Sequence, residues 1–451
     1  MVEIPPEIWA QIAQHLPRDM LISMISVNRT FYTLALDEKY NELAMREING
    51  SFTRKLEALR YVDSSPFSGR VLILSRNPEY AKRVKILHLE PPCLHELANY
   101  QKLHPPDLQN TQQRSNSIKD FAGWFFQSLL PAKQAQEEPH VSATEIADTL
   151  ADLLPRLHGV SRFSLTWENA STFHAPYLDS TWNGLSANLQ ELHLDLHPQF
   201  AAIRLPLDAD FPQLAALRIT LCPTYTDEPE TMIGNLTKFV NKLEGSLKSL
   251  YIGSLQRRDL GEMYSGLGQF PKLRHVEVSP QTFVCPSTMI QFLQNHSDTL
   301  SSIIYTSDSN KLYINGLSSL QLENLRELTM KLHYTPYPTA WWTVPSPFFT
   351  SIASTMKRLT IEGAVTLEEL SNLLTALAGV AAPALEELSI SIGSLSAHVL
   401  VGIAEKLPGL HSLDLRIHDV VEKSLFPKTP GEFFPYDSVS GTNLPHLAHL
   451  Y

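Results

Sequence analysis

The chain has few cysteines, no long apolar run and no excess of basic residues. Its 451 residues include three cysteines, Cys93, Cys222 and Cys285, whose spacing fits no zinc ligand set. So few cysteines, in an odd number, are typical of a reducing compartment, and the sequence predicts a cytoplasmic or nuclear protein. No window approaches 18 consecutive apolar residues, and the N-terminus lacks the basic and apolar stretches of a signal peptide. The sequence therefore predicts neither secretion nor a membrane span.

The charge balance is acidic. The chain has 36 Lys and Arg against 47 Asp and Glu, which gives a formal net charge of −11 at pH 7. Proteins that bind nucleic acid without sequence preference need clustered Lys and Arg to neutralise phosphates, so nucleic acid is not an expected partner. Hydrophobic residues make up 43% of the chain, enough for folded cores.

Catalytic motifs are also absent. The sequence has no Walker phosphate loop, no G-x-S-x-G, no H-E-x-x-H and no C-x-x-C, and His95-Glu96 lacks a second histidine at zinc spacing. We therefore predict that the protein is not an enzyme and uses no cofactor and no metal. An enzyme with a site assembled from distant loops stays open as an alternative.

The first 35 residues predict three short helices. Pro5 and Pro6 suit a first helical turn, and Ile8, Ile12 and Leu16 then recur on one face. A second helix is expected from a cap at Asp19, and a third from a cap at Asn28. A domain this small normally needs a disulfide, a metal or a partner for stability. Since no cysteine precedes Cys93, a partner is expected.

This segment resembles an F-box, the adaptor-binding module of Skp–cullin–F-box ubiquitin ligases. The resemblance covers roughly the first 45 residues, rests on Ile4–Ile8, the aliphatic series through Leu16, Leu21 and Val27–Phe31, and is similar to the form common in fungal F-box proteins. It implies binding to a Skp-type adaptor and, through it, to a cullin. The residues expected to contact the adaptor are Ile4, Pro5, Ile8, Ile12, Leu16, Leu21, Val27 and Phe31. The alternative is a three-helix cap on the following domain.

The rest of the chain repeats a short L-x-x-L-x-L unit. Nine clear copies begin at Leu189, Leu214, Leu247, Leu273, Leu300, Leu325, Met356, Leu385 and Leu410. Weaker copies begin at Val84, Val160 and Leu447. Amphipathic helices are expected between the copies, one of them opened by the capping box Thr366-x-x-Glu369. Most intervals sit at or just beyond the leucine-rich range of about 20 to 29 residues.

The repeats resemble irregular leucine-rich repeats of the kind that commonly follow an F-box. The family's asparagine or cysteine at the ninth position is matched by Cys222 alone. The predicted fold class is an α/β repeat, with the three-helix F-box followed by an irregular leucine-rich-repeat solenoid that has parallel strands on its concave face and helices on its convex face. An ordinary α/β domain with parallel strands is the alternative.

Three regions are predicted. Residues 1–48 form the adaptor-binding module, 49–140 a connecting region with the first degenerate repeat and polar, proline-rich insertions, and 141–451 the solenoid. A further proline-rich insertion between Tyr334 and Phe349 contains Trp341 and Trp342, and aromatic residues on such a loop suit a binding role.

Function is expected on surfaces. Residues that flank the central leucines of each strand face the concave side and carry charges of both signs, which suits a protein target. The residues expected to bind the target are His193, Arg218, Tyr251, Glu277, Lys331, Trp341, Trp342, Arg358 and Arg416. The sequence thus predicts a substrate-recognition subunit of a Skp–cullin–F-box ubiquitin ligase. A leucine-rich-repeat interaction or assembly protein unconnected with ubiquitin is the alternative.

Overall fold

The computed structural model describes residues 4–45, 74, 77–90, 143–167, 176–203, 205–223, 231–255, 259–279, 286–307, 317–332, 346–380, 383–395 and 397–419. The strands are β1 (Glu42–Met45), β2 (Ile86–Leu89), β3 (Arg162–Trp167), β4 (Glu191–Leu196), β5 (Ala216–Leu221), β6 (Ser249–Ser254), β7 (His275–Val278), β8 (Ser302–Ser307), β9 (Glu327–Leu332), β10 (Arg358–Val365), β11 (Glu387–Ser394) and β12 (Ser412–Asp419). The α-helices are α1 (Pro6–Gln14), α2 (Arg18–Ser23), α3 (Arg29–Tyr40), α6 (Pro78–Ala81), α9 (Ala143–Leu153), α10 (Pro176–Leu185), α11 (Pro198–Ile203), α12 (Thr231–Asn241), α13 (Gly261–Ser265), α14 (Pro286–Asn295), α16 (Ser346–Ile352), α17 (Leu367–Leu377) and α18 (Ala397–Lys406). Two 3₁₀ turns, η4 (Leu154–Arg156) and η6 (Leu317–Ser319), complete the described elements.

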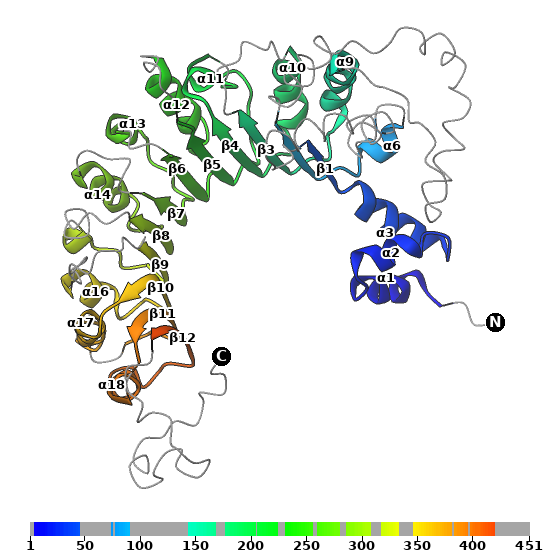
Figure 1. The fold of residues 1–451 in the computed structure, drawn as a ribbon. Helices are drawn as coiled ribbons and strands as arrows, with labels where there is room; N and C mark the ends of the chain where they lie inside the picture. Colours follow the sequence, from blue (N-terminus) through cyan, green and yellow to red (C-terminus); the bar gives the residue numbers. More distant parts are fainter. Residues whose placement is uncertain are drawn as a thin grey trace, which may run out of the picture. The chain divides into compact units, whose positions relative to one another are not determined.

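The chain forms two compact units. The first comprises Met1–Phe200 with Pro206–Leu214, and the second Ala201–Leu205 with Ala215–Tyr451. Strands follow one another in chain order, β1 to β4 in the first unit and β5 to β12 in the second. Within each unit, neighbouring strands pair in parallel and helices cover one face of the strands (Figure 1). This succession of parallel strands and helices confirms the predicted α/β repeat solenoid.

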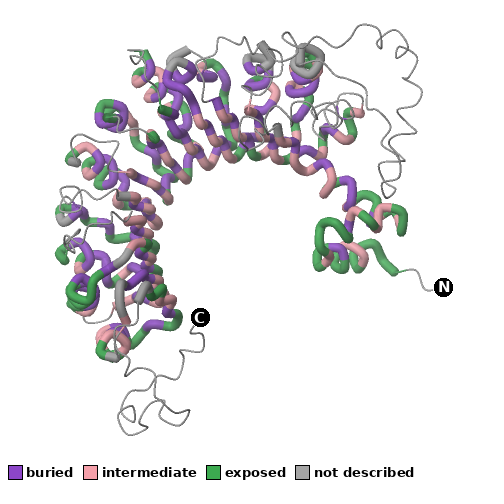
Figure 2. Tube along the Cα trace, in the orientation of Figure 1, coloured by how far each residue is buried: buried purple, intermediate pink, exposed green. Residues whose placement is uncertain are grey.

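The core is built from alternate strand residues. Along β4, partly exposed residues alternate with buried ones, and β5 follows the same pattern as far as Ile219, after which Thr220 is buried as well. The burial colours of Figure 2 show buried and partly exposed stretches along the strands generally. The buried positions of paired strands are in register. In the second unit one such row contains Leu217, Leu250, Val276, Ile303, Leu328, Leu359, Leu388 and Leu413. Each repeat therefore buries its apolar face against its neighbours.

The repeat pattern predicted the strands well. Each of the nine clear copies coincides with one strand from β4 to β12, and the copies at Val84 and Val160 coincide with β2 and β3. The structure adds β1, which the pattern did not predict and which pairs with β2. The weak copy at Leu447 lies outside the described residues.

Two of three predicted helix caps that lie in the described residues are confirmed. The Asn28 side chain accepts a hydrogen bond from Phe31 N at 2.9 Å, and Thr366 and Glu369 form the complete capping box of α17. The predicted cap at Asp19 is wrong. Pro17 occupies the cap position and Asp19 lies in the first turn of α2, where its charge favours the helix dipole.

The predicted regions can be compared with the structure at two places in the chain. β1 lies inside 1–48 and pairs with β2, and the last of the three helices before it ends at Tyr40; the boundary at residue 48 stays a prediction. The polar insertions between 91 and 140 lie outside the described residues. At the end of the later insertion, α16 begins at Ser346 and buries Phe348 and Phe349.

A buried histidine joins two repeats of the second unit. His296 is 3% exposed, and its Nε2 accepts a hydrogen bond from Phe270 N at 3.1 Å. Because Nε2 accepts, the proton lies on Nδ1, which donates to Phe292 O at 2.8 Å. Burial lowers the pKa of His296. The folded protein therefore holds this imidazole in its neutral form.

We predict that acidification destabilises the second unit through His296. A lowered pKa means that the unfolded chain binds the proton first, so stability present at neutral pH is lost as the pH falls through the unfolded pKa of about 6.5. Urea unfolding at pH 7.5 and 5.5 measures this loss, which should be smaller in His296→Gln, whose amide oxygen can still accept from Phe270. An identical pH dependence in both proteins would contradict the prediction.

Gly363 is required by an irregularity of β10. The register between β10 and β11 shifts between Ile361 and Ala364, and Gly363 lies there with φ 128°. A Cβ at Gly363 would collide with the carbonyl oxygen of Leu332.

We predict that Gly363→Ala lowers the free energy of unfolding by about 1–3 kcal/mol, because alanine strains this backbone conformation. Gly402→Ala in α18 is the control, since a Cβ there meets no atom within 4 Å and should stabilise the helix by about 0.5–1 kcal/mol. Urea unfolding followed by circular dichroism compares the two. Equal midpoints for Gly363→Ala and the unchanged protein would rule out this role.

Candidate interaction surfaces

The three N-terminal helices have a small core of their own. It consists of Ala13, Leu21 and Phe31, with Trp9, Leu16, Met24 and Leu34 packed against it. The Trp9 and Phe31 rings meet edge to face with centroids 5.5 Å apart. We call α1, α2 and α3 with this core the helical module.

Two residues that we expected to contact an adaptor belong to this core. Phe31 has no exposed surface and Leu21 is 9% exposed, so both side chains hold the helices together in this structure, and their expected contact with an adaptor stays a prediction. Leu16 is half-buried at the edge of the same core. The apolar residues of this segment extend around more than one helix face, and these positions turn inward.

The other expected contact residues lie on the surface of the module. Ile4 and Ile8 are each 43% exposed, Ile12 is 39% exposed, Val27 is 53% exposed, and Pro5 is also exposed. Ile8 and Ile12 stand four residues apart and share one face of α1. Exposed stretches on these helices are visible in Figure 2. We call Ile8 and Ile12, together with Ile4 just before the helix, the apolar face of α1. The sequence analysis missed Met20, which is 53% exposed on α2.

A groove of about 440 Å³ lies among the three helices. Its apolar lining comes from Ala10, Ala13, Leu16, Leu21 and Leu34, and its polar lining from Gln14, Arg18, Asp37, Glu38 and Asn41. The Arg18 Nε and Glu38 Oε1 atoms, which belong to α2 and α3, form an ion pair at 3.1 Å across it.

Helix α3 is fastened to the first repeat. Arg83 forms an ion pair with Asp37 and donates from Nη1 to Thr33 O at 3.3 Å. The rings of Tyr40 and Tyr80 stack with centroids 4.9 Å apart. Burial and a hydrogen bond with Tyr32 raise the pKa of Tyr80. These contacts fix α3 on α6, whereas the apolar face of α1 takes no part in them.

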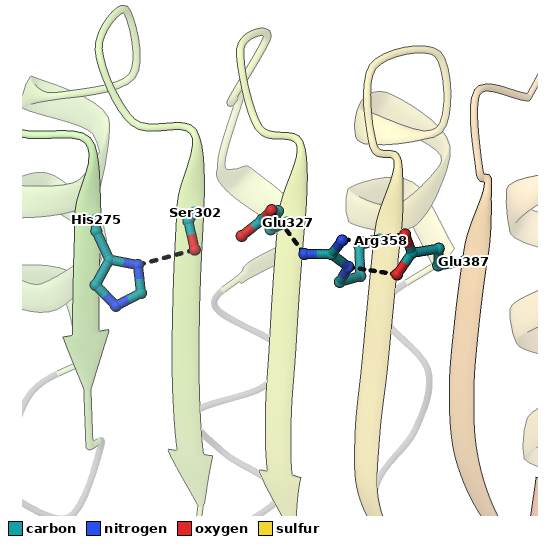
Figure 3. A network of polar contacts seen from close by, with 5 residues as sticks. All are labelled: His275, Ser302, Glu327, Arg358 and Glu387. Atoms are coloured by element: carbon teal, nitrogen blue, oxygen red, sulfur yellow. Dashed lines mark hydrogen bonds and ion pairs between the residues drawn. The ribbon is translucent and has the colours of Figure 1, made fainter. Parts of the chain in front are cut away.

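The open face of the strands in the second unit carries ordered polar rows. The row at the first strand position includes His275, Ser302, Glu327, Arg358 and Glu387, one from each of β7 to β11 (Figure 3). His275 Nδ1 lies 2.8 Å from Ser302 Oγ. Arg358 Nη1 lies 3.0 Å from Glu327 Oε1, and its Nε and Nη2 lie 2.6 and 3.0 Å from the Glu387 carboxylate. The hydrogen bond from Arg358 lowers the pKa of Glu387.

A second row, two residues further along, contains Arg218, Tyr251 and Glu277 from β5, β6 and β7. The Arg218 guanidinium carbon lies 3.8 Å from the Tyr251 ring centroid, and its Nη1 lies 2.6 Å from Glu277 Oε2. The Tyr251 side chain lies along its strand, over Gly253. Because glycine has no Cβ, it leaves room for the Tyr251 hydroxyl group, with which a Cβ at this position would collide. The stacked guanidinium is thus held in place by an aromatic ring and a carboxylate.

Burial acts on the histidine beside this row. It lowers the pKa of His275, although the carboxylates of Glu277 and Glu327 oppose the effect. A neutral imidazole suits its hydrogen bond with Ser302.

The structure brings some of the expected target-binding residues together and separates others. Arg218, Tyr251 and Glu277 form one cluster in the second unit. Arg358 lies in the first row, Lys331 on β9, and Arg416 on β12, where its Nε lies 3.7 Å from Asp414 Oδ2. His193 lies on β4 of the first unit. Trp341 and Trp342 lie outside the described residues.

Within the described ranges, no three His, Cys, Asp or Glu side chains are grouped closely enough to hold a metal ion. None of the helices described is long and apolar enough to span a bilayer. Cys222 is buried, while Cys93 and Cys285 fall outside the described part.

No family model matches the chain, and no curated protein matches it. Among solved structures, the crystal structure of the Rad7 and Elc1 complex in yeast shares 14% identity with a TM-score of 0.36, covering 92% of this chain and 96% of the other. The leucine-rich repeat-containing protein LegL7 from Legionella pneumophila shares 13% identity with a TM-score of 0.32, covering 75% of this chain and 90% of the other. At these TM-scores neither likeness carries an argument, and the fold is assigned from the parallel strands themselves.

We predict that Phe31→Ala unfolds the helical module locally, because truncating a buried phenylalanine costs about 3–5 kcal/mol. Hydrogen–deuterium exchange of the whole chain should show lost protection in α1 to α3 and unchanged protection in β5 to β12. Ile8→Ala is the control and should change stability by less than about 0.5 kcal/mol, since Ile8 is exposed. Equal protection in both variants would mean that Phe31 does not hold the module together.

Proposed function

We propose that the protein is a non-catalytic recognition subunit that docks on a Skp-type adaptor through its helical module and holds a protein target on its strand face. The adaptor would connect it to a cullin-type ubiquitin ligase. Holding the target beside the ligase raises the target's effective concentration there, so this role needs no active site in the chain itself.

The observation that carries the proposal is the apolar face of α1. Ile4, Ile8 and Ile12 each expose about two-fifths of their surface. They stay exposed although the module has an apolar core of its own, made of other residues. Aliphatic side chains grouped on one helix face are typical of a surface that another protein covers. The face also coincides with positions through which the F-box resemblance implies adaptor contact.

A cap on the repeat array is the second candidate, and one observation favours it. Helix α3 packs on the first repeat through Arg83, Asp37, Tyr40 and Tyr80, as a capping helix would. Capping accounts for α3 but leaves the exposed isoleucines of α1 without a role. The two roles are compatible, with α3 as the cap and α1 as the docking helix.

We predict that Ile8→Glu combined with Ile12→Glu abolishes adaptor binding. If each side chain is an anchor worth about 2 kcal/mol, the double variant should bind about 1,000-fold more weakly. Purified full chain and a purified Skp-type adaptor, measured by calorimetry, give this value directly. These two positions are chosen because a charge at Leu21 or Phe31 would disrupt the module's own core.

The matched control is Leu367→Glu combined with Val401→Glu, which places the same two charges on comparably exposed aliphatic residues of α17 and α18 and should leave adaptor binding unchanged. Circular dichroism should show both variants folded. Full adaptor affinity in the Ile8/Ile12 variant, or no affinity in the unchanged protein, would overturn the docking role and leave the capping role.

A further inference from the structure

The second unit has a row of basic residues just before its strands. The residue that immediately precedes each strand from β6 to β10 is Lys248, Arg274, Ser301, Arg326 and Lys357. Backbone hydrogen bonds join these residues in order: Arg274 N donates to Lys248 O, Ser301 N to Arg274 O and Arg326 N to Ser301 O, each at 2.9 Å, and Lys357 N to Arg326 O at 2.7 Å. The positions are therefore neighbours in space. We call Lys248, Arg274, Arg326 and Lys357 the basic row.

All four side chains are exposed. Within the described residues, Lys248, Arg274 and Arg326 form no side-chain hydrogen bond or ion pair. Lys357 Nζ lies 2.7 Å from Oε1 of Glu386, the residue that immediately precedes β11. Three of the four cations are thus available to a ligand, and the fourth is held at the end of the row.

The basic row stands out against the charge of the whole chain. Two positions are compared in each repeat from β6 to β10: the residue before the strand and the first residue of the strand. Together they contain five Lys and Arg residues and one carboxylate, Glu327, in a protein whose formal net charge is −11. The Ser249 hydroxyl group lies in the same two positions and adds a donor for oxygen anions, whereas the Ser301 and Ser302 hydroxyl groups already bond to Arg274 O and His275 Nδ1. Two other carboxylates lie nearby in the sequence. Asp298 is three residues before Ser301, and Glu323 is three residues before Arg326.

The sign of the surface reverses at β11. There, Glu386 and Glu387 occupy the equivalent two positions and pair with Lys357 and Arg358, respectively. This end repels a polyanion that continues beyond the row, and it limits the ligand to a short anionic stretch. A long nucleic-acid strand fits this arrangement poorly.

We propose that the basic row binds a short acidic segment of a protein partner, laid in extended form across the N-terminal ends of β6 to β10. Neighbouring strands lie about 4.8 Å apart, so the row from β6 to β10 spans about 19 Å. An extended peptide rises about 3.3 Å per residue, so about seven residues cover this length and place acidic groups on one side at every second position. The inference deepens the target-binding half of the proposed function and rests on it.

The same anionic chemistry can come from Asp and Glu side chains or from phosphorylated serine, and the experiment separates these sources. Fluorescent octapeptides that alternate Ser with Glu, phosphoserine or Gln are titrated into the full chain and followed by anisotropy at 50 and 300 mM salt. We expect the Glu or phosphoserine peptide to bind at least about tenfold more tightly than the Gln peptide, and binding to weaken at the higher salt. Whichever anionic peptide binds more tightly identifies the source.

The matched variants are Lys248→Gln with Arg274→Gln, and, as a control with the same loss of charge, Lys238→Gln with Lys406→Gln on helices α12 and α18. The first pair should weaken acidic-peptide binding about tenfold, and the control pair should not. Equal loss in both pairs, equal binding of the Gln peptide, or tighter binding of a single-stranded oligonucleotide than of either acidic peptide would overturn the proposal.

Adaptor affinity, measured in parallel on the same variants, keeps the two proposals apart. If the adaptor binds normally while no acidic peptide binds, the inference about the basic row fails and adaptor docking stands. If peptides bind and the adaptor does not, adaptor docking fails and the basic row stands.

Discussion

The structure depends on the register between neighbouring strands. Within the second unit, Leu217, Leu250, Val276 and Ile303 are direct partners on successive strands, and each is buried. Side chains alternate between the two faces of a strand, so a slip of one residue would turn this apolar row out to solvent and the polar residues into the core. Burial of the apolar rows therefore fixes the register strongly.

That register also creates the strand face on which target binding is proposed. Once the buried residues are aligned, the residues between them must align as well, into polar rows on the opposite face. Arg358 lies between Glu327 and Glu387, and Arg218 reaches over Tyr251 to Glu277, because the apolar partners hold their strands level. The basic row follows from the same constraint one position earlier in each repeat.

Much of this fold could be predicted from the sequence, because the repeat unit marks each strand with its own apolar residues. The strand β1 could not, since it has four residues, follows a helix and carries no complete unit. The orientation of the N-terminal helices was also beyond the pattern. α1 has Ile8, Trp9, Ile12 and Ala13 on adjoining faces, so helical spacing alone does not decide which of them turns inward. Phe31 became a core residue through its contact with Trp9, a relation between two helices that periodicity does not encode.

The candidate surfaces were predicted in part, for a similar reason. Positions flanking the leucines were recognised as exposed, but contacts such as that of His275 with Ser302 join residues about one repeat apart and require the register to be known. The basic row was not among the predicted surfaces, because its residues directly precede the strands and the predicted positions lie inside them. Aligning the repeats on their leucines places Lys248, Arg274, Arg326 and Lys357 in one column, so the signal was present in the sequence.

The two proposed surfaces differ in their physical character, and this difference suits a recognition subunit. An apolar helix face such as that of α1 gains its affinity from buried area and is little affected by salt. Exposed cations such as Arg274 and Arg326 act over longer distances, speed association and contribute modestly to lasting affinity. A subunit that must stay on its adaptor while it exchanges targets needs slow dissociation at the first surface and fast association with ready release at the second. If both proposals hold, apolar contacts on the helical module and charged contacts on the strand face would give these two behaviours to different parts of one chain.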